Sequence, residues 1–223
     1  MKTTEKYREF IEKIPKDILI LAVSKTKSER EITALYEAGH RDFGENYVQE
    51  LIQKHQNLPE NIHWHFIGHL QSNKVKYLVP FIHLIHSVDS LKLLKEINKQ
   101  SEKHNRITSV LIQVYSGLES SKFGLNPGQA TELIGQFSES KFSHVRIEGL
   151  MAMGTNTDDE LIVKEEFLQM KELFVKLKKF ETSNIQMKYL SMGMSSDYDL
   201  AIESGSNMIR IGSLIFGERN YQH

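Results

Sequence analysis

The 223-residue sequence predicts an α/β protein that folds as a single (β/α)8 TIM barrel spanning residues 1–223. Three observations predict this class. Eight short apolar or alternating segments, each long enough for one strand, recur along the chain. A segment with helical spacing follows each of them, and no linker longer than a loop intervenes. Alternating strands and helices produce parallel strands with helical crossovers, so eight units in a chain of this length favour a closed barrel over an open sheet.

The first strand is the clearest of these elements. Residues 18–23 form an apolar run, which is typical of a strand buried on both faces. A short amphipathic helix over 3–13 precedes it and adds an extra N-terminal helix to the barrel. Ser28, followed three residues later by Glu31, predicts a capping box at the start of the next helix, and Gly39 closes that helix.

The remaining elements follow in alternation. We expect strands over 40–44, 62–67, 83–88, 108–115, 145–151, 187–191 and 208–211. We expect helices over 45–54, 71–78, 89–102, from 127, over 158–179, over 197–204 and from 213. Asp89 is the expected cap of its helix, and Pro127 suits a first helical turn.

The composition excludes several classes of function. The chain has 28 Lys and Arg against 29 Asp and Glu, so no basic field predicts nucleic-acid binding. It has no cysteine, which excludes disulfides and thiolate metal sites. No run approaches the ~18 apolar residues of a membrane span, and no signal peptide is evident, so we expect a cytoplasmic protein. The 10 histidines show no HExxH-like spacing, and we expect no metal site.

Lys25 is the first candidate for chemistry. It follows the 18–23 strand directly, and barrels place their functional groups at the carboxyl ends of strands. A partly desolvated lysine there can condense with an aldehyde. The alternative is a solvated lysine in a strand-to-helix loop.

The last quarter of the chain provides an anion site at the same end of the barrel. Ser195 and Ser196 follow the seventh strand, and Gly212 and Ser213 follow the eighth. Loops at these two positions, with the start of a short helix, form the recurrent phosphate site of (β/α)8 barrels. The alternative is a pair of ordinary Gly/Ser turns.

Two further residues belong to the expected mouth of the barrel. Arg210 lies in an apolar strand and needs a partner, which is either a structural salt bridge or a ligand. An arginine keeps its proton and would hold a heterocyclic nitrogen unprotonated. Asn46 ends the second strand and is either a ligand contact or a helix cap. A strand-end lysine with a phosphate site suggests a phosphorylated carbonyl ligand, either pyridoxal phosphate or a phosphosugar, and spacing does not choose between them.

Five segments resemble the YggS/PROSC family of pyridoxal-phosphate-binding proteins. They are LAVSKTK at 21–27, FGENYVQE at 43–50, WHFIGHLQSNK at 64–74, LSMGMS at 190–195 and RIGSLIFG at 210–217. The resemblance implies an alanine-racemase-N-terminal-like barrel with pyridoxal 5'-phosphate as cofactor. By that resemblance Lys25 forms a Schiff base with the cofactor, Arg210 faces its pyridine nitrogen and Asn46 lies near it. Residues matching the phosphate-binding segments are Ser195, Gly212 and Ser213, with Ser196 beside them.

The resemblance also implies a role. Family members are regarded as pyridoxal phosphate homeostasis proteins that buffer and deliver the cofactor without established catalysis. Transient contacts with pyridoxal-phosphate-dependent apoenzymes and a monomeric state are the corresponding expectations. The alternative is a racemase-like enzyme acting on an amino acid. Such an enzyme needs a second acid or base, and no residue of the sequence stands out in that role, so we expect no catalytic residue. The chain also ends at His223, without room for the second domain that racemases use. A class-I-aldolase-like barrel is a third reading, and the position of Lys25 on the first strand counts against it.

Overall fold

The computed structural model describes residues 2–115 and 124–217, and its eight parallel strands close into a barrel in sequence order. The strands are β1 Leu19–Val23, β2 Asp42–Glu45, β3 His63–Phe66, β4 Leu84–Val88, β5 Thr108–Tyr115, β6 Val145–Met153, β7 Ile185–Ser191 and β8 Met208–Ile211. Strand β1 pairs with both β2 and β8, which closes the barrel. The predicted (β/α)8 class is confirmed.

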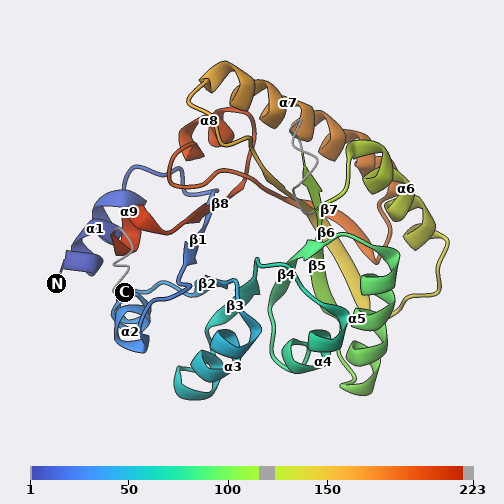
Figure 1. Cartoon of the computed structure of the whole chain (residues 1–223), viewed down its shortest axis with the longest axis horizontal. Coiled ribbons are helices and arrows are strands. Elements are labelled where there is room, and N and C mark those ends of the chain that lie inside the picture. The colour runs from blue at the N-terminus through green and yellow to red at the C-terminus, as the bar shows by residue number, and fades with distance from the viewer. Residues whose placement is uncertain (1, 116–123, 218–223) are drawn as a thin grey trace.

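The helices lie around the outside of the barrel (Figure 1). They are α1 Lys2–Ile11, α2 Glu29–Glu37, α3 Val48–Asn57, α4 Val75–Leu78, α5 Leu91–Lys103, α6 Pro127–Ser138, α7 Glu160–Leu177, α8 Tyr198–Glu203 and α9 Ser213–Phe216, with 3-10 turns η1 Ser72–Lys74 and η2 Lys178–Phe180. The expected extra N-terminal helix is α1, and it packs beside α9 (Figure 1). None of the helices in residues 2–115 and 124–217 is both long and apolar enough to cross a membrane.

Side-chain caps begin four of the described helices, α2, α5, α6 and α7. The capping box at Ser28 is confirmed, because Ser28 Oγ accepts from Glu31 N at 3.3 Å and Glu31 Oε2 accepts from Ser28 N at 2.8 Å. The expected cap at Asp89 is wrong: Ser90 caps α5 by accepting from Leu93 N at 3.3 Å. The helix expected from Glu45 begins instead at Val48, and Glu45 is a buried residue of β2.

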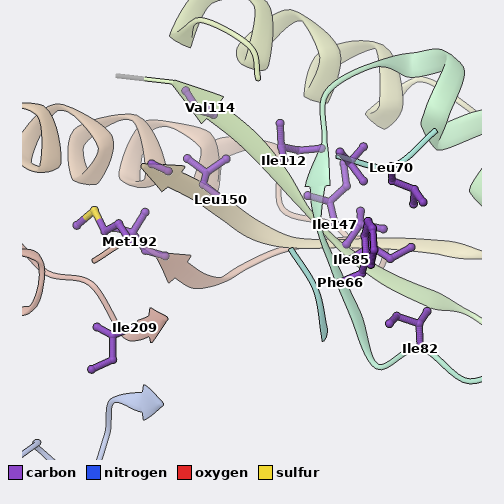
Figure 2. Close-up of a cluster of buried hydrophobic side chains, with 14 of the residues drawn as sticks. Phe66, Leu70, Ile82, Ile85, Ile112, Val114, Ile147, Leu150, Met192 and Ile209 are labelled. Atoms are coloured by element: carbon purple, nitrogen blue, oxygen red, sulfur yellow. The ribbon is translucent and has the colours of Figure 1, made fainter. Parts of the chain in front are cut away.

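The buried apolar side chains form two separate regions. The larger core fills the space between strands and helices and includes Phe66, Ile85, Ile112 and Leu150 (Figure 2). A smaller cluster of Leu84, Leu111, Met151 and Met208 packs together separately. Because strand side chains alternate with a period of two, Arg210 shares the face of Met208, which belongs to the smaller cluster.

Candidate functional site

A cavity of about 850 Å³ opens at the carboxyl ends of the strands. Its lining comes from the ends of β1, β2 and β3, from β6 and β8, and from the loops after β7 and β8. All seven residues that the sequence singles out line this one cavity: Lys25, Asn46, Ser195, Ser196, Arg210, Gly212 and Ser213. The fold therefore assembles in one place residues that lie up to 188 positions apart in the chain (213 minus 25).

The turn that carries Lys25 has a fixed backbone. Ser24 N donates to the Gly44 carbonyl of the neighbouring strand at 2.9 Å, and Lys27 N donates back to the Ser24 carbonyl at 3.0 Å. Thr26 has a φ of 64°, an uncommon conformation for a residue with a side chain. Val23 and Lys25 both line the cavity, as expected when the alternation of β1 continues past its last residue.

A buried polar network below this turn holds it in place. Lys54 Nζ of α3 donates to the Ser24 carbonyl at 2.8 Å, to Glu45 Oε1 at 2.8 Å and to Glu50 Oε1 at 2.7 Å. These three contacts match the three donors of an ammonium group. Ser24 Oγ also donates to Glu45 Oε1 at 2.5 Å, and Thr26 N donates to Glu50 Oε1 at 2.6 Å. The residues on both sides of Lys25 are thus anchored to β2 and α3.

Glu45 is the most perturbed carboxylate of this network. Its burial raises the pKa to about 6, although the charge and hydrogen bond of Lys54 and the hydrogen bond of Ser24 act in the opposite direction. Glu45 Oε2 is buried and lacks a hydrogen-bond partner among the described residues. An unpaired buried oxygen favours the neutral acid, and Lys54 and Ser24 offset that effect.

Arg210 lies deep in the cavity and is buried. Its Nη1 donates to the Ser191 carbonyl at 2.8 Å and the Ser191 hydroxyl at 2.9 Å, and its Nη2 donates to the Ala152 carbonyl at 2.7 Å. Burial lowers its pKa to about 10, against the opposing charge of Asp197, so the guanidinium remains protonated at neutral pH. The partners are carbonyl and hydroxyl oxygens of β6 and β7, which hold a cation in the cavity without neutralising it.

The two loops after β7 and β8 are joined to each other. Gly212 N donates to Ser195 Oγ at 3.3 Å, and Arg210 N donates to the Gly193 carbonyl at 3.0 Å. Gly193 has a φ of 96°, and a Cβ there would lie 2.6 Å from Ala201 Cβ, so this turn requires glycine. The arrangement places three serines and Gly212 around one side of the cavity, as the phosphate-site prediction requires.

Asn46 lines the cavity from the end of β2. Its Oδ1 is buried and has no hydrogen-bond partner among the described residues. Tyr47, not Asn46, is the residue that precedes the first turn of α3, so Asn46 does not act as the cap of that helix. Buried polar atoms are normally paired, and an unpaired one that lines a cavity is consistent with a ligand contact.

Sequence reasoning missed several residues of this site. Lys27 also lines the cavity, and its Nζ donates to the Phe216 carbonyl at 3.4 Å. Met151 and Met153 of β6 contribute apolar wall. The positioning role of Lys54 was hidden because a lysine inside an amphipathic helix normally faces solvent, and only its spacing of four from Glu50 gave a signal.

Comparison with known proteins identifies the class first. The family model described as alanine racemase, N-terminal domain, matches residues 3–220. The alanine racemase of E. faecalis superposes with a TM-score of 0.76 over 98% of this chain and 58% of that chain, at 16% identity. At that identity the likeness concerns the fold, which is the barrel of the racemase N-terminal domain.

Closer relatives define the particular family. A protein of Aquifex aeolicus named pyridoxal phosphate homeostasis protein is 40% identical over 203 residues, covering 91% of this chain and 87% of the relative. A protein of Escherichia coli K12 with the same name is 38% identical over 211 residues, covering 93% and 88%. This chain belongs to the family of pyridoxal phosphate homeostasis proteins, and the resemblance drawn from its motifs is confirmed.

A solved relative extends the comparison to the cofactor. PipY of Synechococcus elongatus is 32% identical and superposes with a TM-score of 0.89 over 96% of this chain and the whole of that chain. The structure of PipY with pyridoxal phosphate bound superposes with a TM-score of 0.87. The names of the homeostasis relatives denote no reaction, and five racemase structures that match are 13–18% identical to this chain.

Proposed function

We propose that this protein binds pyridoxal 5'-phosphate through Lys25 and serves in the homeostasis of that cofactor. The observation that carries the proposal is the convergence of Lys25, Arg210 and the joined β7 and β8 loops on one cavity. Membership of the homeostasis family supports the choice of this cofactor over a phosphosugar. The chain acts in this proposal as one barrel domain over residues 1–223.

The residues present fit this group. A cavity of about 850 Å³ is within the range of cofactor sites. Ser195, Ser196, Gly212 and Ser213 suit a phosphate, because hydroxyl and backbone N–H donors pair with its oxygens. Arg210 suits an unprotonated ring nitrogen, since its guanidinium can only donate. The unpaired Oδ1 of Asn46 offers one more polar contact beside the cofactor.

When bound, pyridoxal phosphate supplies an aldehyde that links to an amine as a Schiff base. Lys25 supplies that amine, and the Lys54 network fixes the residues on both sides of it. Arg210 keeps its proton at its own nitrogen, so the ring nitrogen gains none from it. An unprotonated ring nitrogen would make the bound cofactor a weaker electron sink.

The cavity lining also disfavours a racemase-like enzyme. Among its described residues, the titratable side chains are Lys25, Lys27 and Arg210. Racemisation needs a proton acceptor and a proton donor on opposite faces of the substrate carbon. Arg210 is held in its cationic form, so the two lysines are the proton-transfer groups that the lining offers, with no tyrosine, histidine or carboxylic acid among its described residues. A carrier is therefore the simpler function.

The remaining parts of the proposal concern its setting. We propose that the protein works as a monomer in the cytoplasm and passes the cofactor to apoenzymes through transient contacts. The mouth of the cavity supports the transfer of the cofactor. Ser196 and Ser213 are exposed at its edge, which leaves the phosphate end close to solvent.

A titration with pyridoxal phosphate tests the proposal. The wild-type protein is expected to develop the visible absorption band of an amine-linked cofactor at one equivalent, and Lys25→Ala is expected to lose it. Lys76→Ala removes an exposed lysine of α4 and is the matched control, expected to behave as wild type. A wild type without the band in excess cofactor, or a Lys25→Ala variant that keeps it, would refute the proposed anchor.

A further inference from the structure

A cluster of one aspartate and two histidines lies at the end of the barrel opposite the Lys25 cavity. One ligand atom each from Asp42, His63 and His83 lie within 4.8 Å of one another, the only such group among the described residues. Asp42 begins β2, His63 begins β3, and His83 directly precedes β4. Because the strands are parallel, these positions form the floor of the barrel, and the Lys25 cavity lies at the other ends of the same strands.

The backbone fixes the spacing of the three residues. Asp42 and His63 are direct partners in the β2–β3 register, and Asp42 Oδ1 lies 3.1 Å from His63 Nδ1. His83 N donates to the Trp64 carbonyl at 2.9 Å, which ties it to β3. The rings of His63 and His83 stack with centroids 4.5 Å apart. Three neighbouring strands thus deliver one carboxylate and two imidazoles to one point.

A buried histidine supports this group from inside the barrel. His65 Nε2 lies 3.2 Å from Asp42 Oδ1, and His65 Nδ1 lies 2.9 Å from His86 Nε2. Both His65 and His86 are buried. Ligating carboxylates in metal sites are oriented by hydrogen bonds of this kind from a second layer of residues.

We propose that Asp42, His63 and His83 bind one divalent first-row transition-metal ion, such as zinc, at the floor of the barrel. Imidazole nitrogen and carboxylate oxygen are ligands that zinc accepts in tetrahedral sites, and three protein ligands leave the fourth position to water. The side chain of His63 is 48% exposed, so an ion reaches the group from solvent and the ring can turn toward it.

An ion at this site is expected to change the stability of the protein and to leave its binding of pyridoxal phosphate unchanged. An ion held by all three residues cross-links the starts of β2, β3 and β4, so it stabilises the folded state over the unfolded one. The spacing of the ligands in the sequence, 42, 63 and 83, resembles no metal motif, which is why the sequence predicts no metal site. The ligands converge only after the strands pair.

Isothermal titration of the purified full-length protein with zinc chloride tests this site. We expect wild type to bind one equivalent of zinc, and His63→Gln and His83→Gln each to weaken binding at least about tenfold. Both side chains are exposed, so neither substitution should prevent folding. The control is His69→Gln, which alters an exposed histidine that also lies beside an aspartate, 4.0 Å from Asp89, and is expected to bind zinc as wild type does.

Two further readouts separate a built site from incidental binding. Zinc is expected to raise the thermal midpoint of wild type and of His69→Gln but not that of His83→Gln, and to leave the pyridoxal phosphate titration of wild type unchanged. Cobalt(II) is expected to give the intense visible spectrum of a tetrahedral site with wild type. It is expected to give no such spectrum with His63→Gln or His83→Gln. Absence of saturable zinc binding, or equal binding in wild type and in both floor variants, would overturn the proposal.

Discussion

The Lys54 network beneath Lys25 makes a quantitative prediction. The substitution Lys54→Met keeps the length of the side chain and removes its charge. It leaves Glu45, which is fully buried, without its cation. The Ser24 carbonyl and Glu50 each lose one donor and keep another, from Lys27 N and Thr26 N respectively. Breaking a buried ion pair by removing one partner costs about 3–5 kcal/mol of unfolding free energy.

The pH dependence of that loss follows from the pKa of Glu45. The pKa rises from 4.5 to about 6 on folding, which corresponds to about 2 kcal/mol at 1.36 kcal/mol per pH unit. A carboxyl group whose pKa is raised on folding destabilises the folded state as the pH climbs from 4.5 through 6, and the penalty is complete above that range. Without Lys54 the pKa rises further. The variant should therefore lose most stability at pH 8 and less at pH 5.5.

Urea denaturation at pH 5.5 and pH 8 measures both effects. The double variant Glu45→Gln with Lys54→Met removes the buried charge as well, so it should recover much of the lost stability at pH 8. Pyridoxal phosphate should bind more weakly to Lys54→Met, because the Lys25 turn loses an anchor. Equal stability of Lys54→Met and wild type, a loss independent of pH, or a double variant no better than the single one would refute the reasoning.

Four other substitutions test separate parts of the structure. Arg210→Met removes a donor from three buried oxygens and should lose at least about 1–3 kcal/mol of stability in urea denaturation. It should also weaken cofactor binding, and an unchanged protein would contradict the role of the guanidinium. Gly193→Ala should lose about 1–3 kcal/mol of unfolding free energy, because its Cβ meets Ala201. Gly135→Ala in α6 has 3.9 Å of clearance to Phe180 and should gain about 0.5–1 kcal/mol. Thermal midpoints of the two variants that move in the same direction would contradict this pair of predictions. Ser28→Ala should lose about 1 kcal/mol in urea denaturation with cofactor affinity unchanged, and a change in affinity would show that the cap does more than start α2.

Element type was predictable from the sequence because the signals are local. An apolar run before Lys25 and a capping box at Ser28 depend on residues within one turn or strand, and both predictions hold. The errors arise where two residues compete for the same role. Asp89 and Ser90 are adjacent candidate caps, and only the backbone geometry gives the bond to Ser90.

The site was predictable where it follows the strand ends and unpredictable where it depends on burial. Lys25, Ser195 and Gly212 lie in the loops that follow β1, β7 and β8, and the barrel brings such positions together. Glu45 reads in the sequence as the polar start of a helix, yet it ends a buried strand and pairs with Lys54 nine residues later. That pair exists only because α3 packs over β2, which no local pattern encodes.

The most direct test of the central claim is to locate the cofactor on the chain. The holoprotein is reduced with borohydride to make the linkage permanent, digested and analysed by peptide mass spectrometry. We predict that the reduced pyridoxyl group lies on Lys25, with the Lys27 position unmodified. Modification of another lysine instead of Lys25, or of none in a protein saturated with pyridoxal phosphate, would contradict the account.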